Sequence, residues 1–107
     1  MNERPDRRVA ELLDVLIALE SGEVTTYGDV AATAGHQRQA RLVGRLLGEF
    51  VEWRGVEVPW WRVVNAAGQI RTAPDGRQAE LLRAEGVVVR DGRVRAAPIG
   101  RFCRDPS

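Results

Sequence analysis

The sequence contains no lysine and only one cysteine, and these two scarcities limit what the protein can do. All 16 of its Lys or Arg positions are arginine. The codons of a GC-rich genome produce such a bias, although arginine also binds phosphate bidentately and stacks on bases better than lysine does. Cys103 has no second cysteine for an internal disulfide and no companion ligand at metal-binding spacing. We therefore expect neither a disulfide scaffold nor a metal or cofactor site.

Long apolar runs are also missing. No stretch reaches the length that a bilayer-spanning helix needs, and the charged N-terminal residues do not resemble a secretory signal. With 107 residues, of which 44% are hydrophobic, the chain fits one small domain over residues 1–107. These features predict a cytoplasmic monomer without a membrane partner, associated with the nucleoid if the source is bacterial.

The net charge is only +1, but the charges are unevenly spread along the chain. Residues 1–31 hold seven acids and three arginines, whereas residues 32–48 hold three arginines and no acid. Residues 58–74 likewise hold Arg62 and Arg71 without an acid. A phosphate backbone requires a local basic face rather than a high total charge, so nucleic acid remains a candidate partner.

Apolar residues recur at helical spacing in three N-terminal segments, which predicts helices over residues 5–21, 27–34 and 38–50. Thr26 is expected to cap the second helix, with Asp29 as its capping-box partner. Two short helices joined by a tight, glycine-containing turn, after a longer supporting helix, are typical of a helix-turn-helix.

The rest of the chain reads as short extended segments and one further helix. Extended segments are expected over residues 56–64, 69–71, 87–90 and 93–96, and a helix over residues 78–85. Asp91-Gly92 is a strong signal for a two-residue hairpin turn. Together these elements predict a mainly α fold with small β elements, in the form of a winged-helix-like DNA-binding domain.

Residues 58–68 read Val-Pro-Trp-Trp-Arg-Val-Val-Asn-Ala-Ala-Gly. This segment resembles the active-site loop of the O6-alkylguanine-DNA alkyltransferase family, in which Pro-Cys-His-Arg-Val carries the cysteine that accepts the alkyl group. Trp60 stands in the cysteine position and Trp61 in the histidine position. Transfer needs a thiolate and a neighbouring base, and an indole supplies neither. The resemblance is therefore to the alkyltransferase-like proteins, which recognise alkylated guanine without repairing it.

Three more segments resemble the family, in the same order and at similar spacing, and extend the resemblance over residues 9–86. They are Gly-Glu-Val-Thr-Thr-Tyr-Gly-Asp-Val-Ala at 22–31, Ala-Arg-Leu-Val-Gly at 40–44 and Leu-Leu-Arg-Ala-Glu-Gly at 81–86. The chain departs from the pattern at Glu49-Phe50, where the family commonly has Asn-Pro. Glu85 matches the acid that orients the active-site histidine, and with Trp61 in the histidine position we interpret it as structural.

The resemblance assigns DNA-binding roles to Arg41 and Tyr27, and the chemistry of Thr26, Arg45 and Gly44 indicates further contacts from the same helices. Arg41 would enter the base stack in place of the flipped nucleotide, and Tyr27 would press on its phosphate. Thr26 would cap a helix whose N–H groups face a phosphate, and Arg45 would clamp another phosphate or remain solvated. Gly44 would let the backbone approach a minor groove closely; close helix packing is the other explanation for it. Tyr27 is alternatively a partly buried core residue.

The same resemblance places a lesion pocket around the Trp-Trp segment. Its expected residues are Pro59, Trp60, Trp61, Arg62, Val63 and Arg71, of which Trp61 is equally well explained as a core residue. The function implied is that of a non-enzymatic sensor that binds duplex DNA through the minor groove and flips O6-alkylguanine into this pocket. Nucleotide excision repair proteins would be its further partners.

The rival interpretation is a winged-helix transcription regulator, which reads base edges from the major groove and needs no damaged base. The exposed face of the predicted recognition helix offers Arg41, Gly44, Arg45 and Gly48. This face lacks the Asn and Gln side chains that read adenine, so it favours the sensor.

Overall fold

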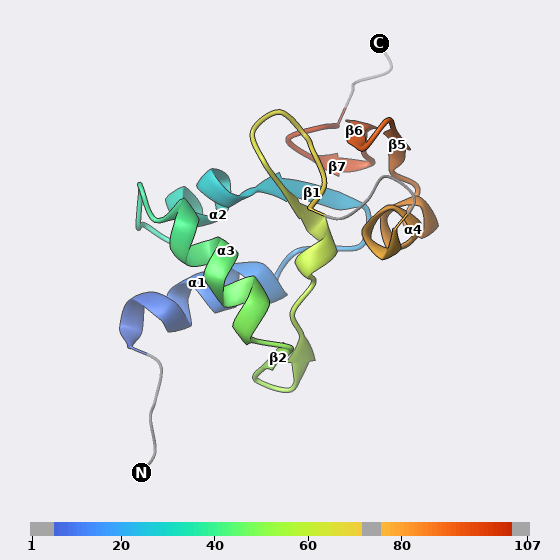
Figure 1. The fold of residues 1–107 in the computed structure, drawn as a ribbon. Helices are drawn as coiled ribbons and strands as arrows, with labels where there is room; N and C mark the ends of the chain where they lie inside the picture. Colours follow the sequence, from blue (N-terminus) through green and yellow to red (C-terminus); the bar gives the residue numbers. More distant parts are fainter. Residues whose placement is uncertain (1–5, 72–75, 104–107) are drawn as a thin grey trace.

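A computed structural model describes residues 6–71 and 76–103 of the chain (Figure 1). Its elements, in order, are α1 (Arg7–Ile17), β1 (Glu23–Thr26), α2 (Tyr27–Thr33), α3 (Ala40–Glu49), β2 (Glu52–Trp53), β3 (Val56–Glu57), the 3₁₀ helix η1 (Trp60–Arg62), β4 (Val63–Val64), α4 (Arg77–Ala84), β5 (Val88–Arg90), β6 (Arg93–Ala96) and β7 (Ile99–Gly100). The four expected helices are confirmed, each within the predicted range or one residue outside it. None of the described helices is long and apolar enough to cross a membrane.

The first two helices begin at residues whose side chains accept from free backbone N–H groups, whereas Gln39 before α3 makes no such bond. The carboxylate of Asp6 accepts from the Val9 N–H at 2.8 Å and starts α1. The hydroxyl of Thr26 accepts from the Asp29 N–H at 3.1 Å and starts α2, as predicted. The Asp29 carboxylate does not return to the Thr26 backbone, because it pairs with Arg101 at 2.9 Å. The expected capping box is therefore half formed.

A three-stranded sheet in the order β4-β1-β7 lies beside the helix-turn-helix, and β1 leads directly into α2 (Figure 1). Strand β1 pairs in parallel with β4 and with β7. Neither β1 nor β7 was predicted from the sequence. The expected hairpin β5-β6 is confirmed, and its turn residues Asp91 and Gly92 have φ values of 54° and 72°. The prediction of an extended segment over 56–64 is wrong in its middle, where η1 interrupts the chain.

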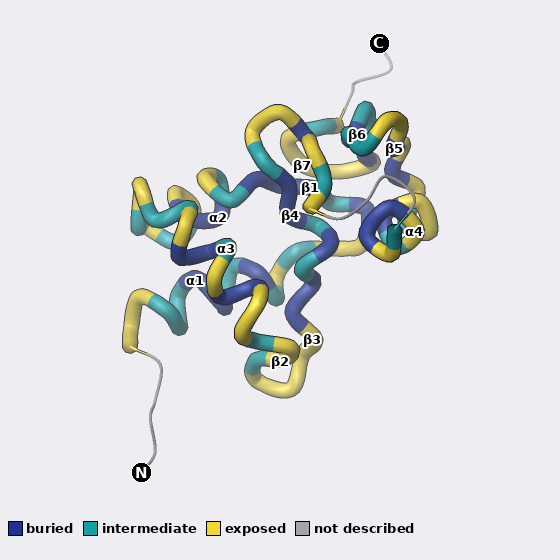
Figure 2. Tube along the Cα trace, viewed as in Figure 1, coloured by how far each residue is buried: buried dark blue, intermediate teal, exposed yellow. Residues whose placement is uncertain are grey.

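The apolar side chains form two clusters. The first joins α1, α2 and α3, with Leu12, Val43 and Leu46 among its buried members. The second lies between the sheet, α4 and the β5-β6 hairpin, with Val64 and Leu82 among its fully buried members. Figure 2 shows buried positions on the facing sides of α1 and α3 and along β1 and β4. Trp60 packs against both clusters, so η1 lies at the seam between them.

Candidate nucleic-acid interface

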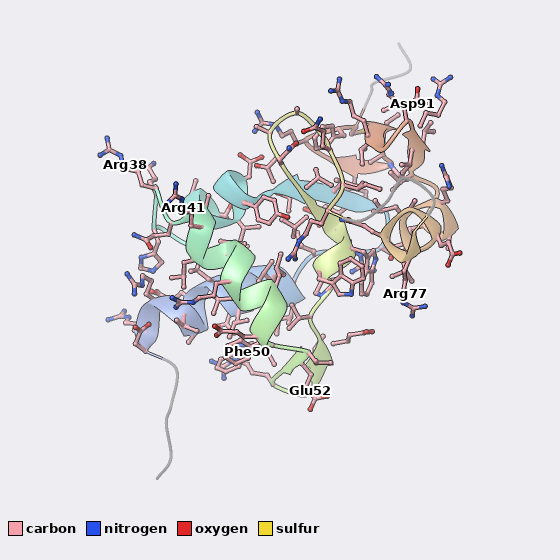
Figure 3. All side chains as sticks on the ribbon, viewed as in Figure 1. Arg38, Arg41, Phe50, Glu52, Arg77 and Asp91 are labelled. Carbon is pink, nitrogen blue, oxygen red and sulfur yellow. The ribbon has the colours of Figure 1, made fainter. Side chains whose placement is uncertain are left out.

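Helix α3 presents an exposed face of arginine and glycine next to the ring of Tyr27. Arg41 projects from the first turn of the helix, away from the body of the protein (Figure 3). Arg45, one turn later, is exposed and lies 3.5 Å from Glu49, so any phosphate clamp at this position must compete with that carboxylate. A Cβ at Gly44 would lie 3.8 Å from the Tyr27 ring, an ordinary contact. Close helix packing therefore does not require glycine at this position.

A shallow hollow of about 360 Å³ lies between the starts of α2 and α3. Its lining residues are Tyr27, Ala40, Arg41, Gly44 and Arg71. Tyr27 is half buried, and burial raises its pKa while the charge of Arg71 lowers it; the net shift is upward. The phenol is therefore neutral at physiological pH and can donate a hydrogen bond to a phosphate oxygen. Thr26, the residue before Tyr27, is buried and its hydroxyl is engaged as the α2 cap.

A second hollow, of about 420 Å³, lies between the end of α3 and η1. Its lining residues are Leu47, Phe50, Val51, Glu57, Val58, Trp60 and Arg71. Arg71 belongs to both hollows and joins them across the face of α3. Val51, at this rim, is 81% exposed. The structure thus brings together Tyr27, Arg41, Gly44, Trp60 and Arg71 from four separate segments.

Four of the expected pocket residues lie behind the hollow rather than on its lining. Pro59 is buried, and Val63 is fully buried in the first cluster. Trp61 is 8% exposed and belongs to the second cluster, with its ring edge-on to Trp60 at a centroid distance of 6.2 Å. Arg62 turns toward Glu85. The expectation that these four residues line the pocket is therefore corrected: in a 3₁₀ helix of three residues per turn, Trp60, Trp61 and Arg62 point in three different directions, and only Trp60 faces the hollow.

Glu85 is the hydrogen-bonding centre behind this segment. Its carboxylate accepts from the Trp61 indole N–H at 2.8 Å, from Arg62 Nη2 at 2.7 Å and from the Gly22 N–H at 2.8 Å. Arg62 Nη1 also donates to the Leu19 carbonyl at 2.8 Å. Burial alone would raise the pKa of Glu85, but hydrogen bonds from Arg62, Gly22 and Trp61 outweigh it and lower the pKa. The interpretation of Glu85 as structural holds, and the indole takes the place of an imidazole as its donor.

Several lining residues were not identified from the sequence. Leu47, Phe50, Val51, Glu57 and Val58 line the Trp60 hollow, and none of them is among the expected pocket residues. The β2-β3 hairpin turns the chain back after α3 through Arg54 and Gly55, which both have positive φ. Arg54-Gly55 is the local sequence signal for this turn. It does not indicate which side chains of the hairpin face outward.

A family model for the 6-O-methylguanine DNA methyltransferase, DNA binding domain, matches residues 8–87. The chain belongs to this family. The DNA base-flipping protein of Escherichia coli K12 is 46% identical over 89 residues, which cover 81% of this chain and 67% of that protein. Alkyltransferase-like protein 1 of Schizosaccharomyces pombe is 32% identical over 90 residues, which cover 80% and 82% of the two chains.

Solved structures agree with this family and with the predicted fold. S. pombe Atl1 in complex with damaged DNA containing O6-carboxymethylguanine superposes with a TM-score of 0.70 and 26% identity, covering 97% of this chain and all of that one (100%). The Mycobacterium tuberculosis OGT in complex with DNA gives a TM-score of 0.60 and 27% identity, covering 78% of this chain and 52% of that one. The alkyltransferase-like resemblance and the DNA-binding fold are thereby confirmed.

Proposed function

We propose that this protein is a non-enzymatic sensor that binds O6-alkylguanine in duplex DNA by flipping the base into the hollow beside Trp60. The observation that carries the proposal is the position of Trp60. By the family resemblance Trp60 corresponds to the nucleophile, and it is partly exposed on the lining of a hollow that shares Arg71 with the Tyr27-Arg41 hollow. An indole in that place can stack on a base but cannot accept an alkyl group.

The two joined hollows support base flipping physically. Extruding a base costs a few kcal/mol of stacking and pairing. Stacking on one aromatic ring returns about 1 to 3 kcal/mol, so Trp60 offsets much of this cost. Arg41 lies at the other hollow, where a guanidinium can fill the vacated space in the base stack. An alkyl group on the guanine would meet the apolar lining of Leu47, Phe50 and Val58.

The relatives support a role in DNA damage rather than in gene regulation. One is named a DNA base-flipping protein, and another is solved on damaged DNA. By the same likeness, we propose that the complex flags the lesion for nucleotide excision repair proteins. The protein would act as one domain and as a monomer in the cytoplasm, or on the nucleoid of a bacterium.

A binding titration tests the proposal directly. Two duplexes of one sequence, with guanine or O6-methylguanine at a single central position, are titrated at the same salt concentration. The sensor function requires tighter binding of the damaged duplex, and this preference should persist when the flanking sequence is changed. Equal binding of the two duplexes, with affinity that follows the flanking sequence, would instead favour the transcription regulator.

A further inference from the structure

The C-terminal strands carry a second basic surface that the lesion site does not use. We propose that this surface, formed by Arg93, Arg95 and Arg101 and called here the C-terminal arginine patch, binds phosphates of the duplex beside the lesion. The proposal rests on duplex binding by the helix-turn-helix face, and it extends that contact to the β6-β7 end of the molecule.

The patch is built by strand alternation. Arg93 and Arg95 are two residues apart on β6 and share one face, while Val94 between them is 4% exposed and points into the second cluster. Arg101 follows β7 and is half exposed. With Val94, Phe102 and Cys103, the three arginines line an open hollow of about 300 Å³.

The patch has three arginines against two neighbouring carboxylates, those of Asp91 and Asp29. Residues 92–103 contain three arginines and no acid. Asp91 lies 3.9 Å from Arg95 and is itself 92% exposed, so this pair is long and solvent-screened. Arg101 contacts Asp29 through Nη1 alone, which leaves the remainder of its guanidinium fork for an acceptor. Clustered guanidinium groups on an open surface match phosphate oxygens in charge and geometry.

The patch is continuous with the proposed DNA face on two sides. Arg101 binds Asp29 of α2 at 2.9 Å, two residues beyond Tyr27. On the other side, the Val94 N–H donates to the Gly68 carbonyl at 2.8 Å, in the loop that leads to Arg71. Gly68 has φ +82°, and a Cβ there would lie 3.1 Å from the Phe102 ring, so this loop packs closely on the floor of the patch. Figure 1 shows β6 and β7 beside this loop.

A duplex seated on α3 that also reaches this loop would thus pass the patch along its backbone. Each phosphate contact neutralised by a cation adds about 0.9 to the steepness of the salt dependence of binding. These contacts carry no sequence or lesion information. Loss of the patch should therefore weaken binding to damaged and undamaged duplex by the same factor.

The test compares the salt dependence of binding for three doubly substituted proteins. In Arg93→Ala/Arg95→Ala, we expect the slope of log affinity against log salt to fall by about 1 to 2, with the ratio of damaged to undamaged affinity unchanged. Arg93→Lys/Arg95→Lys keeps both charges and should retain the slope of the unaltered protein. Arg7→Ala/Arg77→Ala, the control, removes two exposed charges elsewhere and should also retain it.

A slope that is unchanged in the Arg93→Ala/Arg95→Ala protein would overturn the proposal. A slope that falls equally in the Arg7→Ala/Arg77→Ala control would overturn it too, because net charge would then be the cause. Circular dichroism of each variant checks the fold, and a lysine variant as weak as the alanine variant would assign the effect to structure instead of charge. Failure of the lesion-sensor function is distinguishable, since it would abolish the damaged-to-undamaged preference of the unaltered protein.

Discussion

Glu85 shows how one residue supports the lesion hollow without lining it. Its carboxylate holds the Trp61 indole and the Arg62 guanidinium, and Arg62 lies over the Trp61 ring at 5.1 Å. Trp61 in turn meets Trp60 edge to face, an arrangement that favours a fixed angle between the rings. The orientation of Trp60 toward the hollow therefore depends on an ion pair that does not touch the hollow.

Replacing Glu85 by glutamine should destabilise the fold by about 3 kcal/mol at pH 7, because it leaves the largely buried Arg62 without a counter-charge. The pKa of Glu85 lies below its ordinary 4.5, so its stabilisation is fully present above that pH. It is lost as pH falls through the lowered value. Urea unfolding of both proteins, from pH 7 down to below the pKa of Glu85, measures the difference between their free energies of unfolding. This difference should become smaller as the pH is lowered. A difference that does not change with pH would mean that the charge of Glu85 does not stabilise the fold.

Trp60→Ala should reduce the preference for alkylated over normal guanine by about 1 to 3 kcal/mol, the value of one stacked ring. Most nonspecific affinity should remain, because the phosphate contacts lie on other elements. Paired titrations with damaged and undamaged duplex measure the two quantities separately. Val56→Ala, which trims an exposed apolar side chain on β3, is the control. An unchanged preference in a folded Trp60→Ala protein would place the pocket elsewhere.

Arg41 and Arg77 are both exposed helical arginines, but Figure 3 shows them on different parts of the molecule. Arg41→Ala should weaken binding of damaged duplex by over 1 kcal/mol more than Arg77→Ala does, on the order of what a stacked group contributes. Arg77 supplies only screened attraction, which is worth little at a surface. The two variants are compared at one salt concentration. Equal losses would remove the stacking role of Arg41.

At the scale of the element, a substitution at Gly48 of α3 should change protein stability and DNA binding in opposite directions. Among the described residues, nothing lies within 4 Å of a Cβ added at Gly48. Gly48→Ala should therefore stabilise the free protein by about 1 kcal/mol, since glycine is the weaker helix former. If α3 enters a minor groove with this face, the same methyl group should weaken DNA binding. Thermal unfolding and a duplex titration test both halves. Unchanged or tighter DNA binding would exclude close approach of the groove at Gly48.

The helices could be predicted from the sequence, whereas most of the sheet could not. Residues 7–17 and 40–49 repeat apolar positions over several turns, and Thr26 supplies a cap, so these signals are local. Strand β1 covers only four residues, and β4 and β7 two each. Strands this short show no recognisable periodicity in the sequence. Their pairing is also non-local, since Thr25 pairs with Val63. The position of η1, and hence which tryptophan faces outward, follows from that pairing.

At the scale of the whole molecule, the site lies at the seam of two apolar clusters. Trp60 contacts both clusters, and Arg71 lines both hollows. The sequence indicated Trp60 and Arg71 only through the family resemblance, since neither is near α3 along the chain. The apolar lining contributed by Phe50, Val51 and Val58 depends on how the clusters meet, which no local pattern encodes.

The same architecture keeps the single cysteine away from the lesion hollow. Cys103 lines the C-terminal arginine patch and its thiol lies 3.2 Å from the Pro98 carbonyl, whereas the Trp60 hollow is lined by α3, β3 and η1. We expect no alkyl transfer when the protein is incubated with DNA containing O6-methylguanine, and none after Trp60→Cys, because Trp61 cannot activate a new thiol. Protein mass and lesion content are measured together over time. A gain of one methyl group on Cys103 that tracks loss of the lesion would make the protein an enzyme.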